Sequence, residues 1–352
     1  MKRFLSRVLP LLLSFGLILN CTGCSTVLVL AGKARENSEA SSSVISESSA
    51  SSGVISTPVP TEDGDLRAFY TDVANAESVT VMVYMIGSDL ESEDGSATDD
   101  LLEMADAALS ENVHLVLQTG GTETWWNDVC TDDESERFVI ENGDMTLLQS
   151  LGSMNMTDAD TLSDFIRFSA ESYPADRYEL ILWDHGGGTM TGFGYDELYE
   201  DTSLTLSSLS TALYNGGVQF DFIGFDACLM ATAEVAYALD PYADYLIASE
   251  ESEPGEGWAY KNWLTMLAED PAVPTAELGK KLADDFLEAY IFADMPTLSV
   301  LDLRYVPELY AALESYWGSA YTALQSGSYG AFSQVRNNVR EFGDNEYDQV
   351  DL

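Results

Sequence analysis

The chain has 352 residues and carries 15 Lys and Arg against 60 Asp and Glu, a formal net charge of −45. This balance argues against nucleic acid as a partner, because phosphate binding needs clustered Lys and Arg. A hydrophobic content of 46%, with 18 Tyr and 14 Phe, is enough for a sizeable core in one large domain or two small ones.

Residues 1–24 have the features of a lipoprotein-type signal peptide. The basic start "MKRFLSR" precedes the apolar run "VLPLLLSFGLILN", which has about the length of a secretory signal. Gly23 before Cys24 predicts processing that leaves Cys24 as a lipid-bearing N-terminus, although Cys21 stands where Leu is more usual. An uncleaved anchor and ordinary signal cleavage nearby are the alternatives. All three predict that the rest of the chain is exported, and the lipid anchor would hold it at the extracellular face of the membrane.

Residues 25–65 are predicted to be a flexible linker. The segment is rich in Ser, with scattered Glu and Pro, and such a composition cannot bury a core. One folded domain is then expected over residues 66–352.

From residue 79 onwards, apolar runs typical of strands alternate with amphipathic segments. Strands are predicted at 79–86, 113–119, 178–183, 220–225, 244–249 and 297–303, and a hairpin around Asn142-Gly143 at 137–151. Helices are predicted at 97–110, 158–172, 205–217, 229–239, 275–292 and 306–324. Unbroken apolar strands separated by helices indicate an α/β fold with a mostly parallel, six-stranded sheet and helices on both faces.

Two residues of chemical interest follow neighbouring strands of this pattern. His185 in "DHGGG" follows the third strand, and Cys228 in "DAC" follows the fourth. Sites in parallel sheets form beyond the carboxyl ends of the strands, so the sequence predicts a Cys–His dyad there. Cys228 is expected to open a helix, whose N-terminus favours a thiolate, while His185 supplies a positive charge and protonates a leaving amine. A buried core thiol and a disulfide with Cys130 are the alternatives for Cys228.

Other residues around this predicted site have candidate roles. The N–H groups of Gly186 and Cys228 would form an oxyanion hole, although "GGG" is also typical of a tight loop. Asp226 would share a face with Cys228 if the strand continues, and a carboxylate there suits a basic substrate side chain. Its alternatives are a solvated acid or a helix N-cap. Asp184 precedes His185 and could orient it, but adjacent side chains usually point apart.

The loop after the fifth strand, "SEESEPGEGW", would border the same edge of the sheet. Its acids Glu250, Glu251, Glu253 and Glu256 offer a second pocket carboxylate, and an ordinary acidic loop is the alternative. A zinc site is not indicated, because His114 and His185 are the only histidines of the sequence.

Four segments together resemble the clostripain-like cysteine peptidases: "VMVYMIGSDLE", "YELILWDHGGG", "FIGFDACLMATAEVAYAL" and "IASEESEPGEGW". The resemblance runs from about Val79 to the end of the chain. It implies a caspase-like fold and a dyad of His185 and Cys228 without an obligatory third member. It also implies that Asp226 shapes a primary pocket for Arg or Lys, with Glu256, or else Glu253, as a second acid. Calcium dependence is known in the family, but no residue of this sequence identifies a calcium site.

Two departures from the family pattern carry expectations of their own. Family members can mature by cutting after a basic residue between the dyad positions, and no Lys or Arg lies between His185 and Cys228. We therefore expect no such processing there. The final "EYDQVDL" resembles the start of a further family segment, so the domain is expected to continue beyond residue 352.

The leading hypothesis is a lipid-anchored cell-surface cysteine endopeptidase that cleaves protein or peptide substrates after Arg or Lys. The first alternative is a binding lipoprotein on the same fold with weak catalysis or none. A structural lipoprotein with a Cys130–Cys228 disulfide is the second alternative.

Overall fold

The computed structural model of the chain describes residues 66–199, 202–290, 296–343 and 349–352. The predicted signal peptide, Cys24 and the predicted linker therefore lie outside the described residues. Within these ranges, no helix combines the length and the apolar character needed to cross a membrane.

One eight-stranded sheet organises the domain, with the strand order β4-β3-β2-β1-β5-β6-β7-β8. The pairs β1–β2, β1–β5, β5–β6 and β6–β7 are parallel, whereas β2–β3, β3–β4 and β7–β8 are antiparallel. The strands are β1 (Val79–Ile86), β2 (Val113–Gly120), β3 (Ser135–Glu141), β4 (Asp144–Gly152), β5 (Arg177–Trp183), β6 (Phe220–Asp226), β7 (Ala243–Ala248) and β8 (Ser299–Asp302).

The predicted mostly parallel α/β architecture is confirmed, but the predicted count of six strands is wrong. The predicted hairpin forms β3 and β4 and extends the same sheet at one edge. Asn142 and Gly143 both have positive φ, 54° and 84°, as a two-residue hairpin turn requires.

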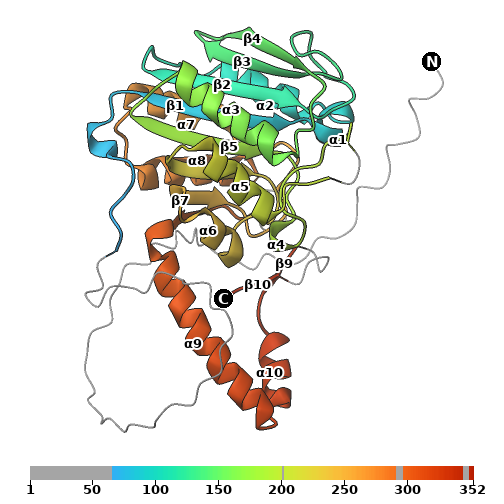
Figure 1. Cartoon of the computed structure of the whole chain (residues 1–352), viewed down its shortest axis with the longest axis vertical. Helices are drawn as coiled ribbons and strands as arrows, with labels where there is room; N and C mark the ends of the chain where they lie inside the picture. Colours follow the sequence, from blue (N-terminus) through green and yellow to red (C-terminus); the bar gives the residue numbers. More distant parts are fainter. Residues whose placement is uncertain (1–65, 200–201, 291–295, 344–348) are drawn as a thin grey trace, which may run out of the picture.

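Helices cover both faces of the sheet, with α3, α5 and α6 on one face and α2, α7 and α8 on the other (Figure 1). Smaller elements are the 3₁₀ helices η1 (Val73–Asn75) and η2 (Leu303–Tyr305) and the strands β9 (Glu341–Phe342) and β10 (Gln349–Val350). The α-helices are α1 (Ser88–Ser92), α2 (Ser96–Ala105), α3 (Ala159–Ser172), α4 (Gly188–Thr191), α5 (Leu206–Gly216), α6 (Ala233–Leu239), α7 (Tyr260–Glu269), α8 (Thr275–Ala289), α9 (Val306–Gln325) and α10 (Tyr329–Arg336).

The central strand β1 shows why its sequence is apolar without interruption. Met82 and Tyr84 point into the core beneath α3, and Val81 and Val83 point into the core beneath α2. Every residue of β1 is buried, and each large apolar side chain buried in this way contributes about 1.5–3 kcal/mol. A strand covered on both faces needs apolar residues at both parities.

Ion pairs, one of them fully buried, lie at the amino-terminal ends of the parallel strands, opposite the carboxyl ends. Arg177 at the start of β5 pairs with Asp221 at 2.7 Å. Arg67 pairs with Asp244 at 2.8 Å and with Asp240 at 3.3 Å, next to the start of β7. The described chain therefore begins at the edge remote from the predicted site.

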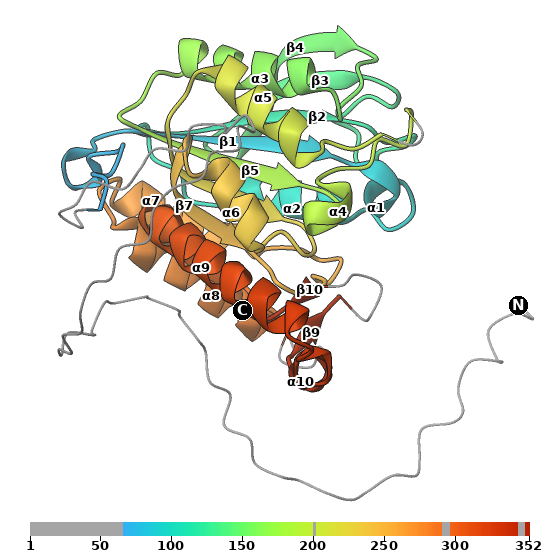
Figure 2. The same ribbon diagram turned by 60° about the horizontal axis from the view of Figure 1, so that its bottom comes forward.

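The last part of the chain forms an arm. Helix α9 extends away from the sheet and α10 lies near its far end (Figure 1, Figure 2). The strands β9 and β10 then return towards α4, the short helix that follows His185 (Figure 1).

Candidate active site

His185 and Cys228 follow two neighbouring parallel strands at the same level. In the β5–β6 pair, Trp183 lies opposite Asp226, and the Asp184 N–H donates to the carbonyl of Asp226 at 3.2 Å. Each of the two candidate residues comes two positions after its member of the Trp183–Asp226 pair. The structure thus places them at adjacent carboxyl ends of the sheet, as the sequence predicts.

Gly186 brings the two loops into direct contact. A Cβ at this position would lie 2.1 Å from the carbonyl oxygen of Cys228 and 3.0 Å from the side chain of Met230. Only glycine allows this packing, because any side chain would push the His185 loop away from Cys228. Within the described ranges, neither the Gly186 N–H nor the Cys228 N–H donates a backbone hydrogen bond.

Cys228 lies in a turn and not at a helix N-terminus, so that part of the sequence prediction is wrong. Strand β6 ends at Asp226, and α6 begins only at Ala233. Leu229 between them has φ of 67°, a strained conformation for a residue with a side chain. Its N–H donates to the carbonyl of Glu251 at 3.1 Å, which ties the turn to the loop after β7. Cys228 is therefore not the residue that opens α6.

The thiol of Cys228 is held by the backbone of Glu253. The Glu253 N–H donates to Sγ at 3.2 Å, and the thiol donates to the Glu253 carbonyl oxygen at 3.8 Å. Burial raises the pKa of the Cys228 thiol above its ordinary value, and the Glu253 N–H offsets this only in part. No hydrogen bond joins Sγ to His185 in the described part of the chain. The thiol in this arrangement is protonated and needs a base.

The imidazole of His185 is hydrogen-bonded to Asp89, which follows β1. Nε2 lies 2.6 Å from Asp89 Oδ1, and both side chains are about half exposed. Asp184 points elsewhere: its carboxylate accepts from the Ser88 hydroxyl at 2.7 Å and from the N–H of Tyr195. Burial raises the pKa of Asp184 to about 7. Asp184 therefore holds the loops around His185 rather than the imidazole itself.

Asp226 faces a buried acidic cluster on the α2 side of the sheet. Its Oδ2 accepts from the N–H of Trp258 at 3.1 Å and from the hydroxyl of Tyr260 at 2.8 Å. Asp100 of α2 accepts from the indole N–H of Trp183 at 2.6 Å. A Cβ on Gly257 would lie within 3.0 Å of the carboxylates of both Asp226 and Asp100, so the two acids flank this glycine.

Glu253 completes the acidic cluster of Asp100, Asp226 and Glu253. Both of its carboxylate oxygens are buried beside the Asp226 carboxyl and the Trp258 side chain, and among the residues described neither oxygen has a hydrogen bond of good geometry. Burial first, and then the neighbouring charges of Asp226 and Cys228, raise the pKa of Glu253 well above its usual value. Burial also raises the pKa of Asp226 to about 6 and that of Asp100 well above the ordinary range.

No described Lys or Arg forms an ion pair with any acid of this cluster. Buried ionised carboxylates are costly unless they take up protons, as their raised pKa values indicate, or a cation joins them. The cluster is therefore suited to receive one positively charged group.

Among the other acids of the loop after β7, none joins this cluster. Glu256 is exposed on the surface. Glu250 accepts from the hydroxyl of Ser299 at 2.6 Å, and Glu251 accepts from the N–H of Gly343 at 3.0 Å. Of the two candidates for the second pocket acid, the structure brings Glu253, and not Glu256, next to Asp226.

The two cysteines of the described domain are both free, and the structure contains no Cys130–Cys228 disulfide. Cys130 lies in the apolar core on the α2 side, where burial raises its pKa to about 12. Cys130 is a core thiol, whereas Cys228 lies just beyond the carboxyl end of β6.

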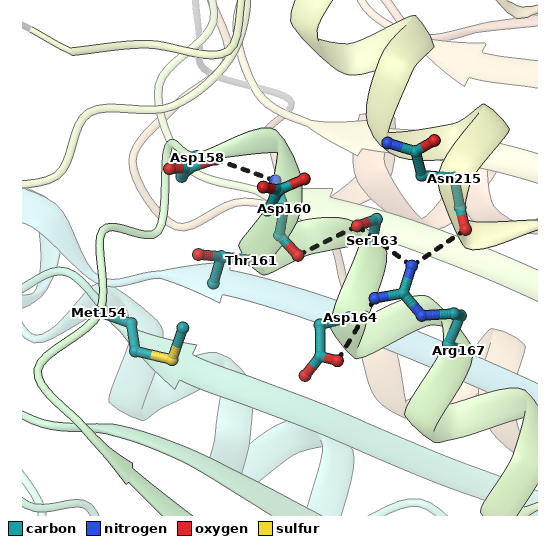
Figure 3. A pocket seen from close by; sticks show the side chains of 8 residues that line it. All are labelled: Met154, Asp158, Asp160, Thr161, Ser163, Asp164, Arg167 and Asn215. Carbon is teal, nitrogen blue, oxygen red and sulfur yellow. Dashed lines mark hydrogen bonds and ion pairs between the residues drawn. The ribbon is translucent and has the colours of Figure 1, made fainter.

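A hollow of about 620 Å³ lies away from both candidate residues, over α3 (Figure 3). Arg167 on its wall donates to the carbonyl of Asn215 at 3.0 Å and pairs with Asp164 at 3.4 Å. Its polar groups largely satisfy one another, so the hollow adds nothing to the site. In the described ranges, no group of three or more His, Cys, Asp or Glu residues is arranged to hold a metal ion.

Sequence reasoning missed Asp89 and Asp100. Asp100 carries a usable signal, because it lies three positions after Ala97 and four before Met104, both buried on the core face of α2. Leu102 of the same helix is 63% exposed, although it is apolar. Asp89 lies in the short helix α1, 96 positions before His185, and carries no such signal.

The chain is similar to proteins of known family. A model of the clostripain family matches residues 83–352. Clostripain from Hathewaya histolytica is 35% identical over an alignment of 123 residues, which covers 30% of this chain and 23% of the length of that protein.

Solved structures show the same fold. A secreted C11 cysteine protease from Bacteroides thetaiotaomicron, in complex with an irreversible peptide inhibitor, has a TM-score of 0.55 and 23% identity over 67% of this chain and 68% of that one. An inactive zymogen C11 protease from Parabacteroides distasonis has a TM-score of 0.53 and 27% identity over 66% and 64% of the two chains.

Proposed function

The chain belongs to the clostripain family, and we propose that it is a cysteine endopeptidase that hydrolyses peptide bonds after Arg or Lys. Cys228 is the nucleophile, and His185 is the general base and acid. The observation that carries this proposal is the packing of the His185 loop, through Gly186, onto the backbone of Cys228 at adjacent strand ends.

Catalysis begins when His185 takes the proton of the Cys228 thiol and the thiolate attacks the carbonyl carbon of the substrate. The N–H groups of Gly186 and Cys228, which donate no backbone hydrogen bond in the described chain, are free to stabilise the oxyanion. His185 then protonates the leaving amine, and water deprotonated by His185 hydrolyses the thioester.

The acidic cluster selects the residue before the cut. A guanidinium or ammonium group of the substrate that reaches Asp226 and Glu253 would form an ion pair with these buried carboxyls and favour their ionised forms. Asp100, whose carboxylate also lies beside Gly257, is the third acid of the same pocket. The family resemblance of Asp226 supports the same assignment.

We also propose that the protein is exported and held at the cell surface by a lipid on Cys24. The basic and apolar start of the sequence supports export, and a relative from Bacteroides thetaiotaomicron is described as secreted. Arg67 forms ion pairs with Asp240 and Asp244 near the amino-terminal ends of the parallel strands. The start of the described domain and the dyad therefore lie at opposite ends of these strands. Calcium remains a candidate cofactor by family resemblance only.

Covalent labelling tests the nucleophile and the specificity together. A peptidyl-arginine chloromethyl ketone should alkylate Cys228 and leave Cys130 unlabelled, and peptide mass mapping identifies the modified residue. The matched reagent with citrulline, which is neutral and similar in shape, should react much more slowly. Reversible binding of Arg peptides without an adduct or turnover would instead favour the alternative of a binding lipoprotein.

A further inference from the structure

We propose that Asp89 is a positioning residue for His185, which makes the site a Cys–His–Asp arrangement rather than a dyad alone. The inference deepens the proposed peptidase function and rests on it. It starts from the 2.6 Å contact between Asp89 Oδ1 and His185 Nε2, which belong to segments 96 positions apart.

The contact decides which imidazole nitrogen acts on the thiol. An ionised carboxylate only accepts hydrogen bonds, so Nε2 carries the hydrogen and donates it to Asp89. In the neutral ring, Nδ1 then holds the lone pair. Nδ1 of His185 is thus the nitrogen that accepts the Cys228 proton, and Asp89 favours the imidazolium that results.

Asp89 is presented to His185 by a constrained turn at the end of β1. The Gly87 N–H donates to the carbonyl of Gly120 at 2.8 Å, and the Ser88 N–H donates to that of Gly121 at 3.1 Å. Ser88 adopts a φ of 49°, which is uncommon for a residue with a side chain. Its hydroxyl donates to Asp184 at 2.7 Å.

Asp184 couples this turn to His185 itself. It directly precedes the histidine, and its other carboxylate oxygen accepts from the N–H of Tyr195, whose ring lies edge-on to the imidazole at 6.3 Å. The charged or titratable groups around the imidazole are thus Asp89 from α1, Asp184 from the end of β5, Tyr195 from the loop after α4, and Cys228 across Gly186.

The left-handed conformation of Ser88, held by the buried Asp184, costs free energy, and such strain is concentrated at functional sites. If this turn served only to end β1 beside β2, Ser88 would not need a left-handed conformation. This turn places the Asp89 carboxylate against the imidazole, and the geometry therefore supports a role for Asp89 in positioning His185.

The size of the effect follows from exposure. Both side chains are about half exposed, at 43% for His185 and 46% for Asp89, so solvent screens the pair. Asp89→Asn should therefore lower kcat for an Arg substrate by about two- to fivefold, far less than loss of a fully buried triad acid. KM should change little, because Asp89 contacts no residue of the acidic cluster that binds substrate.

Nuclear magnetic resonance of the two histidines provides a direct readout. His114 and His185 are the only histidines of the sequence, so ¹⁵N-labelled imidazoles give two sets of ring-nitrogen signals, with His114 as the internal control. In a Cys228→Ala background, neutral His185 should be the Nε2–H tautomer. Asp89→Asn should move the His185 titration midpoint to lower pH, because the carboxylate that favours the imidazolium is gone. His114 should not move.

Matched variants separate positioning from a purely structural role. Glu93→Gln removes the same charge at the end of the same helix, and Glu93 is exposed, so neither kcat nor the His185 titration should change. Asp89→Glu should restore part of the kcat lost in Asp89→Asn.

The proposal is overturned if Asp89→Asn and Glu93→Gln give the same kcat and the same His185 titration as the parent. If Asp89→Asn unfolds, Asp89→Glu and the tautomer of the parent decide the question. A parent that shows no Cys228-dependent cleavage would refute the peptidase function, while the titration would still test the Asp89–His185 pair on its own.

Discussion

Replacing Asp226 by Asn tests the acidic cluster with little change in shape. The amide oxygen of Asn can still accept from the Trp258 N–H and the Tyr260 hydroxyl, which lie 3.1 and 2.8 Å from Asp226 Oδ2. The substitution removes a negative charge and leaves the packing around Gly257 in place. Any loss of activity is therefore due to the missing negative charge and not to a change in the shape of the pocket.

The expected loss can be worked out from burial. Asp226 is only 5% exposed, so its interaction with a substrate cation is a charge-assisted hydrogen bond worth about 1.5–3 kcal/mol. At 1.36 kcal/mol for each factor of ten, kcat/KM for a substrate with Arg before the cut should fall about 10- to 150-fold. Glu253 and Asp100 remain, so some preference for a cation should survive.

The assay compares Arg with citrulline at the residue before the cut, in the parent and in Asp226→Asn. Citrulline cleavage should be slow in both proteins and almost unaffected by the substitution. Glu256→Gln is the matched control, because Glu256 is exposed, and it should change kcat/KM less than twofold. An equal loss for Arg and citrulline would refute the role assigned to Asp226.

Three further outcomes follow from the same contacts. Gly186→Ala should lower kcat by about 10²–10³-fold, because its Cβ would lie 2.1 Å from the Cys228 carbonyl and displace an oxyanion donor; activity close to the parent's would contradict this packing. Burial raises the pKa of Glu179 to about 8 and of Asp184 to about 7, so these acids favour folding when protonated. The urea midpoint, measured in Cys228→Ala at high salt, should then fall as the pH rises from about 5 to 8, and a rising midpoint would contradict it. Thiol titration of residues 25–352 with a chromogenic disulfide should find one fast thiol, Cys228, and one slow thiol, Cys130; two blocked thiols would indicate a disulfide.

The sequence was informative wherever burial on both faces of the sheet constrains it. The unbroken apolar runs located the strands, and the rule that sites lie at carboxyl strand ends then located His185 and Cys228. The predicted start of the helix after Cys228 was wrong, because Leu229 has a left-handed conformation. Leu is a good helix former, so its presence does not indicate such a conformation.

The remaining site residues depend on packing between distant segments. Asp89 and His185 meet because β1 and β5 are neighbours in the sheet, an order that local patterns do not encode. The choice between Glu253 and Glu256 depends on the path of a loop containing Pro254 and Gly257, where the left-handed φ of 62° at Gly257 turns the chain against Asp226. Composition alone cannot distinguish two acids in one such loop.

The central claim is tested most directly by hydrolysis of a substrate series that varies only the residue before the cut. Residues 25–352 are assayed with and without calcium, beside Cys228→Ala. We predict cleavage after Arg and Lys, little after citrulline or Leu, and none by Cys228→Ala. Equal cleavage by Cys228→Ala, or cleavage confined to apolar residues, would contradict the account.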